Sequence, residues 1–245
     1  MKFAFLGATK GMGRALARLL AERGDQICVL GRDMADLGRT ASDLEARGAD
    51  GQVTPIECDL ENPARFGDAL AEADQALGGL DGVVVTAGAF ATQDELEADE
   101  ARAERLLRIN FSCTVMFCEA AKKRLLASGG GTLCVFSSVA GERGRKPVIL
   151  YGATKAGLTQ YLEGLDHKHS AEGLRVVTVK PGFVKTSMTA GLTPPPFAGD
   201  PDQVAARVLA AIDRGVPVVY APSIWRLIMA VIRALPRFVM RRIQF

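Results

Sequence analysis

The sequence has few of the residues that hold metal ions or form disulfides. It has two histidines, at positions 167 and 169, and five cysteines, an odd number without any Cys-x-x-Cys spacing. The cysteines lie in apolar segments, so we expect free, buried thiols in a reducing compartment rather than a disulfide framework or a zinc site. No metal is expected.

The chain also lacks a charge excess and a long apolar run. Thirty Lys and Arg against 28 Asp and Glu leave a formal charge of +2, too small for a surface that serves to hold nucleic acid. The longest uncharged apolar run near the C-terminus, residues 227–232, is much shorter than a bilayer span. Residues 1–6 are too short for the apolar core of a secretion signal. We therefore expect a cytoplasmic protein with no nucleic acid partner.

Short apolar segments alternate with longer amphipathic ones along the chain, a pattern typical of βαβ units. Strands are expected at residues 2–6, 26–30, 52–57, 82–85, 131–136, 174–180 and 216–220. Helices are expected at residues 11–23, 33–47, 63–77, 99–127, 150–170 and 201–214. The pattern predicts a single α/β domain with a doubly wound (Rossmann), seven-stranded parallel sheet and helices on both faces.

A glycine-rich turn follows the first expected strand. Gly7, Gly11 and Gly13 lead directly into the first expected helix. Backbone amides at a helix N-terminus bind a pyrophosphate when no Cβ atoms stand in the way. Glycines also make tight turns that bind nothing, but the place of this turn in the first βαβ unit predicts a dinucleotide site.

The end of the second strand indicates which dinucleotide binds. An NAD site usually places an acidic residue there for the ribose hydroxyls, whereas a 2′-phosphate favours a guanidinium. Here the strand is followed by Gly31 and Arg32, and Lys10 adds a second cation from the glycine turn. Both charges could simply be solvated, but together they favour NADP(H). Asp59 and Leu60, after the third strand, are expected over the adenine, with Asp59 near its amino group.

A second set of residues carries proton-transfer chemistry. Tyr151 and Lys155 are four residues apart, which places them on one face of a helix. A phenol with a pKa of about 10 exchanges protons poorly at neutral pH unless a positive charge stabilises its phenolate. Ser138 follows an apolar strand, where its hydroxyl would project into a cleft. Each pattern alone is commonly accidental, but the three residues together favour a catalytic group.

With the glycine turn, these residues resemble the short-chain dehydrogenase/reductase family over nearly the full chain. The family's helix asparagine is matched by Asn110, and its Pro-Gly segment after the sixth strand by Pro181 and Gly182. Two positions depart from the family pattern. Leu6 replaces the threonine that usually precedes the first glycine, and residues 85–88 read Val-Thr-Ala-Gly where Asn-Asn-Ala-Gly is common.

The resemblance implies hydride transfer between a nicotinamide and a carbonyl carbon. Tyr151 would be the general acid in reduction, and Ser138 would donate a hydrogen bond to the carbonyl oxygen. Lys155 would lower the tyrosine pKa and hold the ribose, Asn110 would hold a water that links Lys155 to solvent, and Thr186 would touch the carboxamide. The expected cofactor contacts are Gly7, Thr9, Lys10, Gly11, Met12, Gly13, Arg32, Asp59, Leu60, Ala87, Gly88, Tyr151, Lys155, Pro181, Gly182, Val184 and Thr186.

The C-terminus departs from the family further. We expect residues 1–222 to form the NADP(H)-binding catalytic domain and residues 223–245 a basic amphipathic extension. Arg226, Arg233 and Arg237 are spaced to share one helix face. The opposite face would carry four apolar residues, Trp225, Ile228, Met229 and Ile232.

The extension resembles the tail of reductase subgroups that act on lipid-linked substrates. Its amphipathic pattern favours peripheral contact with the inner face of a membrane, for which Trp225, Phe238 and Phe245 are suited. The alternative is a helix that packs over the active site or across a dimer.

The sequence therefore predicts an NADP(H)-dependent carbonyl reductase or secondary-alcohol dehydrogenase. Its substrate would be an apolar or lipid-linked small molecule, bound beside a loop at residues 186–200 that contains Met188, Leu192 and Phe197. A homodimer or homotetramer is expected.

Two alternatives to this function stay open. A 3-oxoacyl-carrier-protein reductase is the alternative within the enzyme class, because Arg143, Arg145 and Lys146 could hold an acidic carrier. A non-catalytic NADP(H) sensor is the alternative from another class. The presence of both Tyr151 and Lys155 disfavours the sensor, since such proteins commonly lose one of the two.

Overall fold

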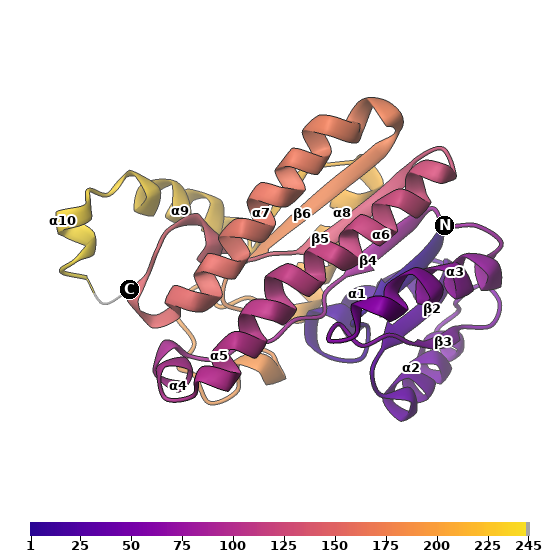
Figure 1. Cartoon of the computed structure of the whole chain (residues 1–245), viewed down its shortest axis with the longest axis horizontal. Helices are drawn as coiled ribbons and strands as arrows, with labels where there is room; N and C mark the ends of the chain where they lie inside the picture. Colours follow the sequence, from indigo (N-terminus) through magenta and orange to yellow (C-terminus); the bar gives the residue numbers. More distant parts are fainter. Residues whose placement is uncertain (244–245) are drawn as a thin grey trace.

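Seven parallel strands form one sheet in the computed structural model, which describes residues 1–243 (Figure 1). The strands lie in the order β3-β2-β1-β4-β5-β6-β7. Their bounds are β1 Lys2–Leu6, β2 Gln26–Gly31, β3 Thr54–Glu57, β4 Gly82–Val85, β5 Gly131–Phe136, β6 Leu174–Pro181 and β7 Val218–Ala221. The predicted doubly wound fold is confirmed.

The apolar runs form strands because both faces of the sheet are covered. In β1, Ala4 and Leu6 pack with α3 (Phe66–Leu77), α6 (Thr114–Ala127) and α7 (Ile149–His169). The alternate residues, Phe3 and Phe5, pack on the other face with α1, α2 and α8. These three helices span Gly11–Glu22, Met34–Ala46 and Pro201–Arg214. Side chains of one strand therefore enter two separate cores.

The helix expected at residues 99–127 is wrong as a single element. The structure contains α5 (Glu100–Leu107), a π-helical segment (Arg108–Cys113) and then α6. The Thr114 hydroxyl donates to the Ile109 carbonyl oxygen, five residues earlier, at 2.7 Å. The extra residue in this turn changes the direction of the side chains that follow, and π-helical turns are frequent at functional sites.

A short helix, α4 (Gln93–Glu97), was missed in the sequence. It begins with a capping box, in which Thr92 accepts from the Glu95 amide and the Glu95 side chain accepts from the Thr92 amide. The spacing Thr-x-x-Glu is the signal that would have predicted it.

The bounds of four strands differ from the prediction, and β2 and β6 each end one residue later than expected, at Gly31 and Pro181. β3 begins at Thr54 rather than at residue 52, and β7 spans Val218–Ala221 rather than residues 216–220. Pro217 precedes β7 and offers only its carbonyl oxygen, which accepts from the Thr178 amide at 2.8 Å.

The C-terminal extension forms α9 (Ile224–Ala234) and α10 (Arg237–Met240), which lie together at one end of the molecule (Figure 1). The prediction that Arg226, Arg233 and Arg237 share one helix face is wrong, because α9 ends at Ala234 and Pro236 separates it from α10. Phe245 lies outside the described residues. Within residues 1–243, none of the helices has the length and apolarity that crossing a bilayer requires.

The face of α9 that was expected to meet a membrane is instead packed against the protein. Trp225, Met229 and Ile232 are buried in a small cluster with Val139, and Ile228 lies against it. The sequence left open a helix that packs over the active site or across a dimer, and the structure packs this face of α9 on its own chain, against Val139.

Candidate active site

The glycine turn lies at the carboxyl end of β1, where the chain enters α1. Gly7 and Gly11 have φ values of +101° and +53°, which L side chains rarely adopt. A Cβ on Gly7 would stand 2.6 Å from the Thr86 hydroxyl oxygen, and a Cβ on Gly13 would overlap the Gly7 carbonyl oxygen. Within the described chain no side chain caps the first turn of α1, so its amides remain available to an anion.

A cavity of about 560 Å³ opens beside this turn. It brings together most of the cofactor contacts expected from the sequence: Gly7, Thr9, Lys10, Gly11, Met12, Gly13, Arg32, Asp59, Leu60, Ala87, Gly88 and Thr186. The segments come from β1, β2, β3, β4 and the loop after β6, all at the carboxyl edge of the sheet. This edge is where open parallel sheets bind ligands.

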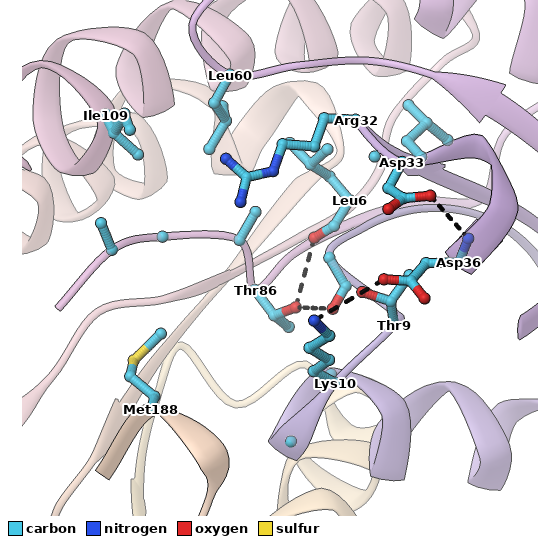
Figure 2. Close-up of a pocket in the computed structure, with 18 of the residues that line it drawn as sticks. Leu6, Thr9, Lys10, Arg32, Asp33, Asp36, Leu60, Thr86, Ile109 and Met188 are labelled. Atoms are coloured by element: carbon cyan, nitrogen blue, oxygen red, sulfur yellow. Dashed lines mark hydrogen bonds and ion pairs between the residues drawn. The ribbon is translucent and has the colours of Figure 1, made fainter. Parts of the chain in front are cut away.

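Two cations and two carboxylates stand at one end of the cavity (Figure 2). Asp33 caps α2 by accepting from the Asp36 amide at 3.0 Å. The Asp36 carboxylate pairs with Arg39, whose bond lowers the pKa of Asp36, and lies 3.8 Å from the Lys10 ammonium. Figure 2 shows the Arg32 side chain extending into the cavity away from both carboxylates. The Lys10 ammonium thus lies beside α2, and the Arg32 guanidinium is directed into the cavity (Figure 2).

The residues after β3 form another wall. Asp59 accepts from the Glu61 amide at 3.0 Å, which fixes its carboxylate in a local turn. Leu60 is buried and points toward the same cavity (Figure 2). Burial raises the pKa of the Cys58 thiol to about 12, so it is no nucleophile at neutral pH.

Ser138 and Tyr151 meet at the carboxyl end of β5. Ser138 is buried, and its hydroxyl accepts from the Ala140 amide at 3.1 Å. Burial raises the pKa of Tyr151 to about 12, and the hydrogen bond with Ser138 and the charge of Arg145 oppose that rise. The Tyr151 ring packs edge-on against Phe90, with 5.1 Å between centroids. The phenol is therefore protonated at neutral pH and held in one orientation.

Lys155 lies one helical turn after Tyr151, and its side chain is buried whereas that of Tyr151 is half-buried. Its ammonium donates to the Phe136 carbonyl oxygen at 3.0 Å and lies 5.8 Å from the centroid of the Tyr151 ring. Burial lowers the pKa of Lys155 to about 8. A Cβ on Gly88 would lie 3.9 Å from this ammonium, so Lys155 stands directly behind the cavity wall.

Asn110 is fully buried in the π-helical turn. Its side-chain oxygen accepts from the Ala89 amide and its side-chain nitrogen donates to the Ala89 carbonyl oxygen, both at 2.7 Å. Asn110 also stands next to Gly88, where a Cβ would lie 3.1 Å from the Asn110 side-chain oxygen. Asn110 and Lys155 therefore flank the same glycine.

Four cofactor contacts were expected between the end of β6 and the loop that follows it, and only one of them lines the cavity. Thr186 lines the cavity, whereas Pro181, Gly182 and Val184 do not. Val184 is buried in the core that contains α8, and Trp225 lies so close to Gly182 that a Cβ would overlap its indole. Contact of these three with a cofactor stays a prediction.

Some residues of the site were not selected from the sequence. Thr86, noted only as a departure from the family pattern, donates to the Gly7 carbonyl oxygen at 2.8 Å and so supports the glycine turn. Phe90 orients the Tyr151 ring, and Ile109 lines the cavity. Thr86 follows β4 directly at the sheet edge, a position that could have indicated its role.

The sequence of this chain is similar to those of known proteins. The short chain dehydrogenase family matches residues 3–196. An uncharacterised oxidoreductase of Mycobacterium tuberculosis (strain ATCC 25618 / H37Rv) is 34% identical over 236 residues, covering 96% of this chain and 94% of its own. Carbonyl reductase family member 4 of Xenopus tropicalis is 29% identical over 218 residues, covering 86% and 90%.

A solved structure supports the fold. A short-chain type dehydrogenase/reductase from Mycobacterium ulcerans superimposes with a TM-score of 0.80 at 23% identity, covering 89% of this chain and 86% of its own. With the match over residues 3–196, these findings show that the chain belongs to the short-chain dehydrogenase/reductase family of nicotinamide-dependent oxidoreductases.

Proposed function

We propose that the protein is an NADP(H)-dependent reductase of ketones, or dehydrogenase of secondary alcohols, with an apolar or lipid-linked substrate. The observation that carries this proposal is the half-buried Tyr151 side chain with the Lys155 ammonium 5.8 Å from its ring, beside a cavity that Arg32 and Lys10 line. The similarity to a protein named as a carbonyl reductase supports the same reaction class.

The residues that line the cavity fit a dinucleotide that carries a 2′-phosphate. Side chains at Gly7 or Gly13 would fill the turn, and the free amides of α1 suit a pyrophosphate. Arg32 and Lys10 would hold the 2′-phosphate through charge-assisted hydrogen bonds. Because Asp33 and Asp36 are engaged in a helix cap and an ion pair, their charges oppose this phosphate less than free carboxylates would.

The proposed chemistry follows from the positions of the protein groups. When bound, the nicotinamide supplies the hydride for the carbonyl carbon. Ser138 orients the carbonyl oxygen, and Tyr151 donates its hydroxyl proton to that oxygen, which leaves a phenolate. The Lys155 charge stabilises the phenolate. Asn110 would hold a water that links Lys155 to solvent, through which a proton returns to the tyrosine.

The substrate side of the site is apolar. Met188, Leu192 and Phe197 lie on the loop after β6 and are exposed, and Met188 also lines the cavity. The carrier-protein alternative draws on Arg143, Arg145 and Lys146, of which Arg143 and Lys146 donate to carbonyl oxygens of the C-terminal extension, at Leu235 and Arg241. This use of the two cations favours a free or lipid-linked carbonyl compound.

We also propose a cytoplasmic homodimer or homotetramer. Five buried free thiols suit a reducing compartment.

The test is NADPH and NADH oxidation with a panel of apolar ketones, acyl thioesters and keto-sugars. We expect turnover with NADPH and apolar ketones, and weaker turnover with NADH. A preference for acyl-carrier thioesters would replace the substrate assignment. Tight NADPH binding without turnover on any compound would support the sensor alternative and overturn the proposal.

A further inference from the structure

The second face of α9 is apolar and exposed. Helix α9 buries Trp225, Met229 and Ile232 against the protein. Its opposite side exposes Ile224, Leu227 and Val231, of which Leu227 is 64% and Val231 57% exposed. In α10, Phe238 is 61% exposed. Large apolar side chains that stand out from the surface at several adjacent helical positions mark a site of contact.

Exposed cations alternate with these apolar residues along the chain. Arg226, Arg237, Arg241 and Arg242 are all exposed. The Lys146 ammonium joins them, since it donates to the Arg241 carbonyl oxygen at 2.9 Å. The sequence from residue 214 to residue 245 contains no Asp or Glu, so the extension itself supplies no carboxylate to neutralise these charges.

Arg233 has a different role. Its guanidinium lies 3.8 Å from the buried carboxylate of Glu142, which also accepts from Lys180 at 2.8 Å and from the Tyr220 hydroxyl. Arg233 therefore helps to attach α9 to the body of the protein, and the other arginines are directed to solvent.

We infer that α9 and α10 dock on the surface of an anionic lipid bilayer, with Leu227, Val231 and Phe238 inserted among the headgroups and the four exposed arginines on the lipid phosphates. Apolar side chains bordered by guanidinium groups match a surface with acyl chains below a layer of negative charge. A second copy of the chain is disfavoured, because two copies of this face would bring like charges together. Nucleic acid offers no environment for the apolar residues.

Docking would bring the substrate loop to the bilayer. On the inner side of α9, the Trp225 indole donates to the Phe197 carbonyl oxygen at 3.3 Å. The loop that contains Phe197 is thus attached to the docking helix. The inference goes beyond the proposed reductase activity and does not depend on it.

The test is co-sedimentation of the full chain with vesicles of phosphatidylcholine alone or mixed with phosphatidylglycerol. We expect the protein to pellet with the mixed vesicles at low salt and to be released by high salt. L227S/V231S/F238S should remain in the supernatant. R226Q/R237Q should bind about 30-fold more weakly at low salt, because each basic residue near an anionic leaflet contributes to affinity.

Two matched controls separate docking from general changes. L107S/M116S alters exposed apolar residues on α5 and α6, and R207Q/R214Q removes exposed charges from α8. Both should pellet as the wild type does. Circular dichroism melting of each variant establishes that it is folded.

Wild-type protein that stays in the supernatant with mixed vesicles would overturn the inference, as would a folded L227S/V231S/F238S variant that pellets normally. Sedimentation velocity without lipid tests whether a second copy of the chain binds this face instead. Self-association that this triple variant abolishes, together with no vesicle binding, would assign the face to a second copy instead.

Discussion

The glycine turn and helix α9 were both identified from sequence patterns, but only the first pattern indicated the correct geometry. At Gly7 and Gly11 the requirement is local, because their positive φ values disfavour other residues. In α9 apolar residues occur on two faces, and packing against Val139 decides which face is buried. A motif set by backbone geometry can be recognised from sequence, whereas the orientation of a helix requires its packing partner.

Among the predictions that test this comparison, the largest effect is expected on the reaction rate when Tyr151 is replaced. The role of Tyr151 was assigned from a local motif. Tyr151→Phe should lower the rate of NADPH-dependent reduction by about 10²–10⁴-fold, because the phenyl ring has no proton to donate. NADPH affinity should remain close to that of the wild type, since the hydroxyl acts on the substrate. Turnover and fluorescence titration with NADPH measure both effects. Substantial residual turnover would mean that another group donates the proton.

The next largest effect separates the two faces of α9. Trp225→Ala should lower the free energy of unfolding by about 3–5 kcal/mol, because it opens a cavity against Gly182 and removes the bond to Phe197. Leu227→Ala, on the exposed face, should change it by less than about 0.5 kcal/mol. Urea unfolding gives both values. Equal losses in the two variants would show that both faces of α9 are packed.

A smaller effect is expected at the cation end of the cavity. Arg32→Ala should weaken NADPH binding by about 1–3 kcal/mol and leave NADH binding almost unchanged, because only NADPH carries the 2′-phosphate. Arg47→Ala is the control, since Arg47 ends α2 in ion pairs with Glu22 and Asp43. If the wild-type protein bound NADPH and NADH with equal affinity, the predicted preference for NADP(H) would be wrong.

The smallest effect concerns pH. Burial lowers the pKa of Lys155 to about 8, so its charge is present below that pH and is lost above it. NADPH affinity should therefore fall as the pH rises past 8, by at most about tenfold per pH unit. Lys155→Met should bind more weakly and without this dependence. A wild-type affinity that stays constant from pH 7 to about pH 10 would contradict a charged Lys155 at the ribose.

Some parts of the fold and site could be predicted from the sequence because their signals are short and local. The strands of the sheet, the turn at Gly7 and the cations Arg32 and Lys10 around the cavity are of this kind. Tyr151 and Lys155 likewise share the helix face on which their spacing placed them, although their catalytic roles stay predictions.

Other features depend on contacts between distant segments. The π-helical turn that directs Asn110 toward Ala89 interrupts a stretch whose periodicity indicates one continuous helix. The support of the glycine turn by Thr86 joins residues 79 positions apart. Burial of the ammonium of Lys155 similarly follows from the assembled core. None of these contacts leaves a periodic signal in the sequence.

The most direct test of the proposed reduction is to label the hydride of NADPH with deuterium and to measure its transfer to the product. Wild-type protein would be given NADPH that carries deuterium at both C4 positions of the nicotinamide, together with the most active ketone of the panel, and the alcohol would be analysed by mass spectrometry. We predict one deuterium on the carbinol carbon, and about 10²–10⁴-fold slower incorporation with Tyr151→Phe. NADPH that binds but transfers no deuterium to any ketone, thioester or keto-sugar would show that the protein is not this reductase.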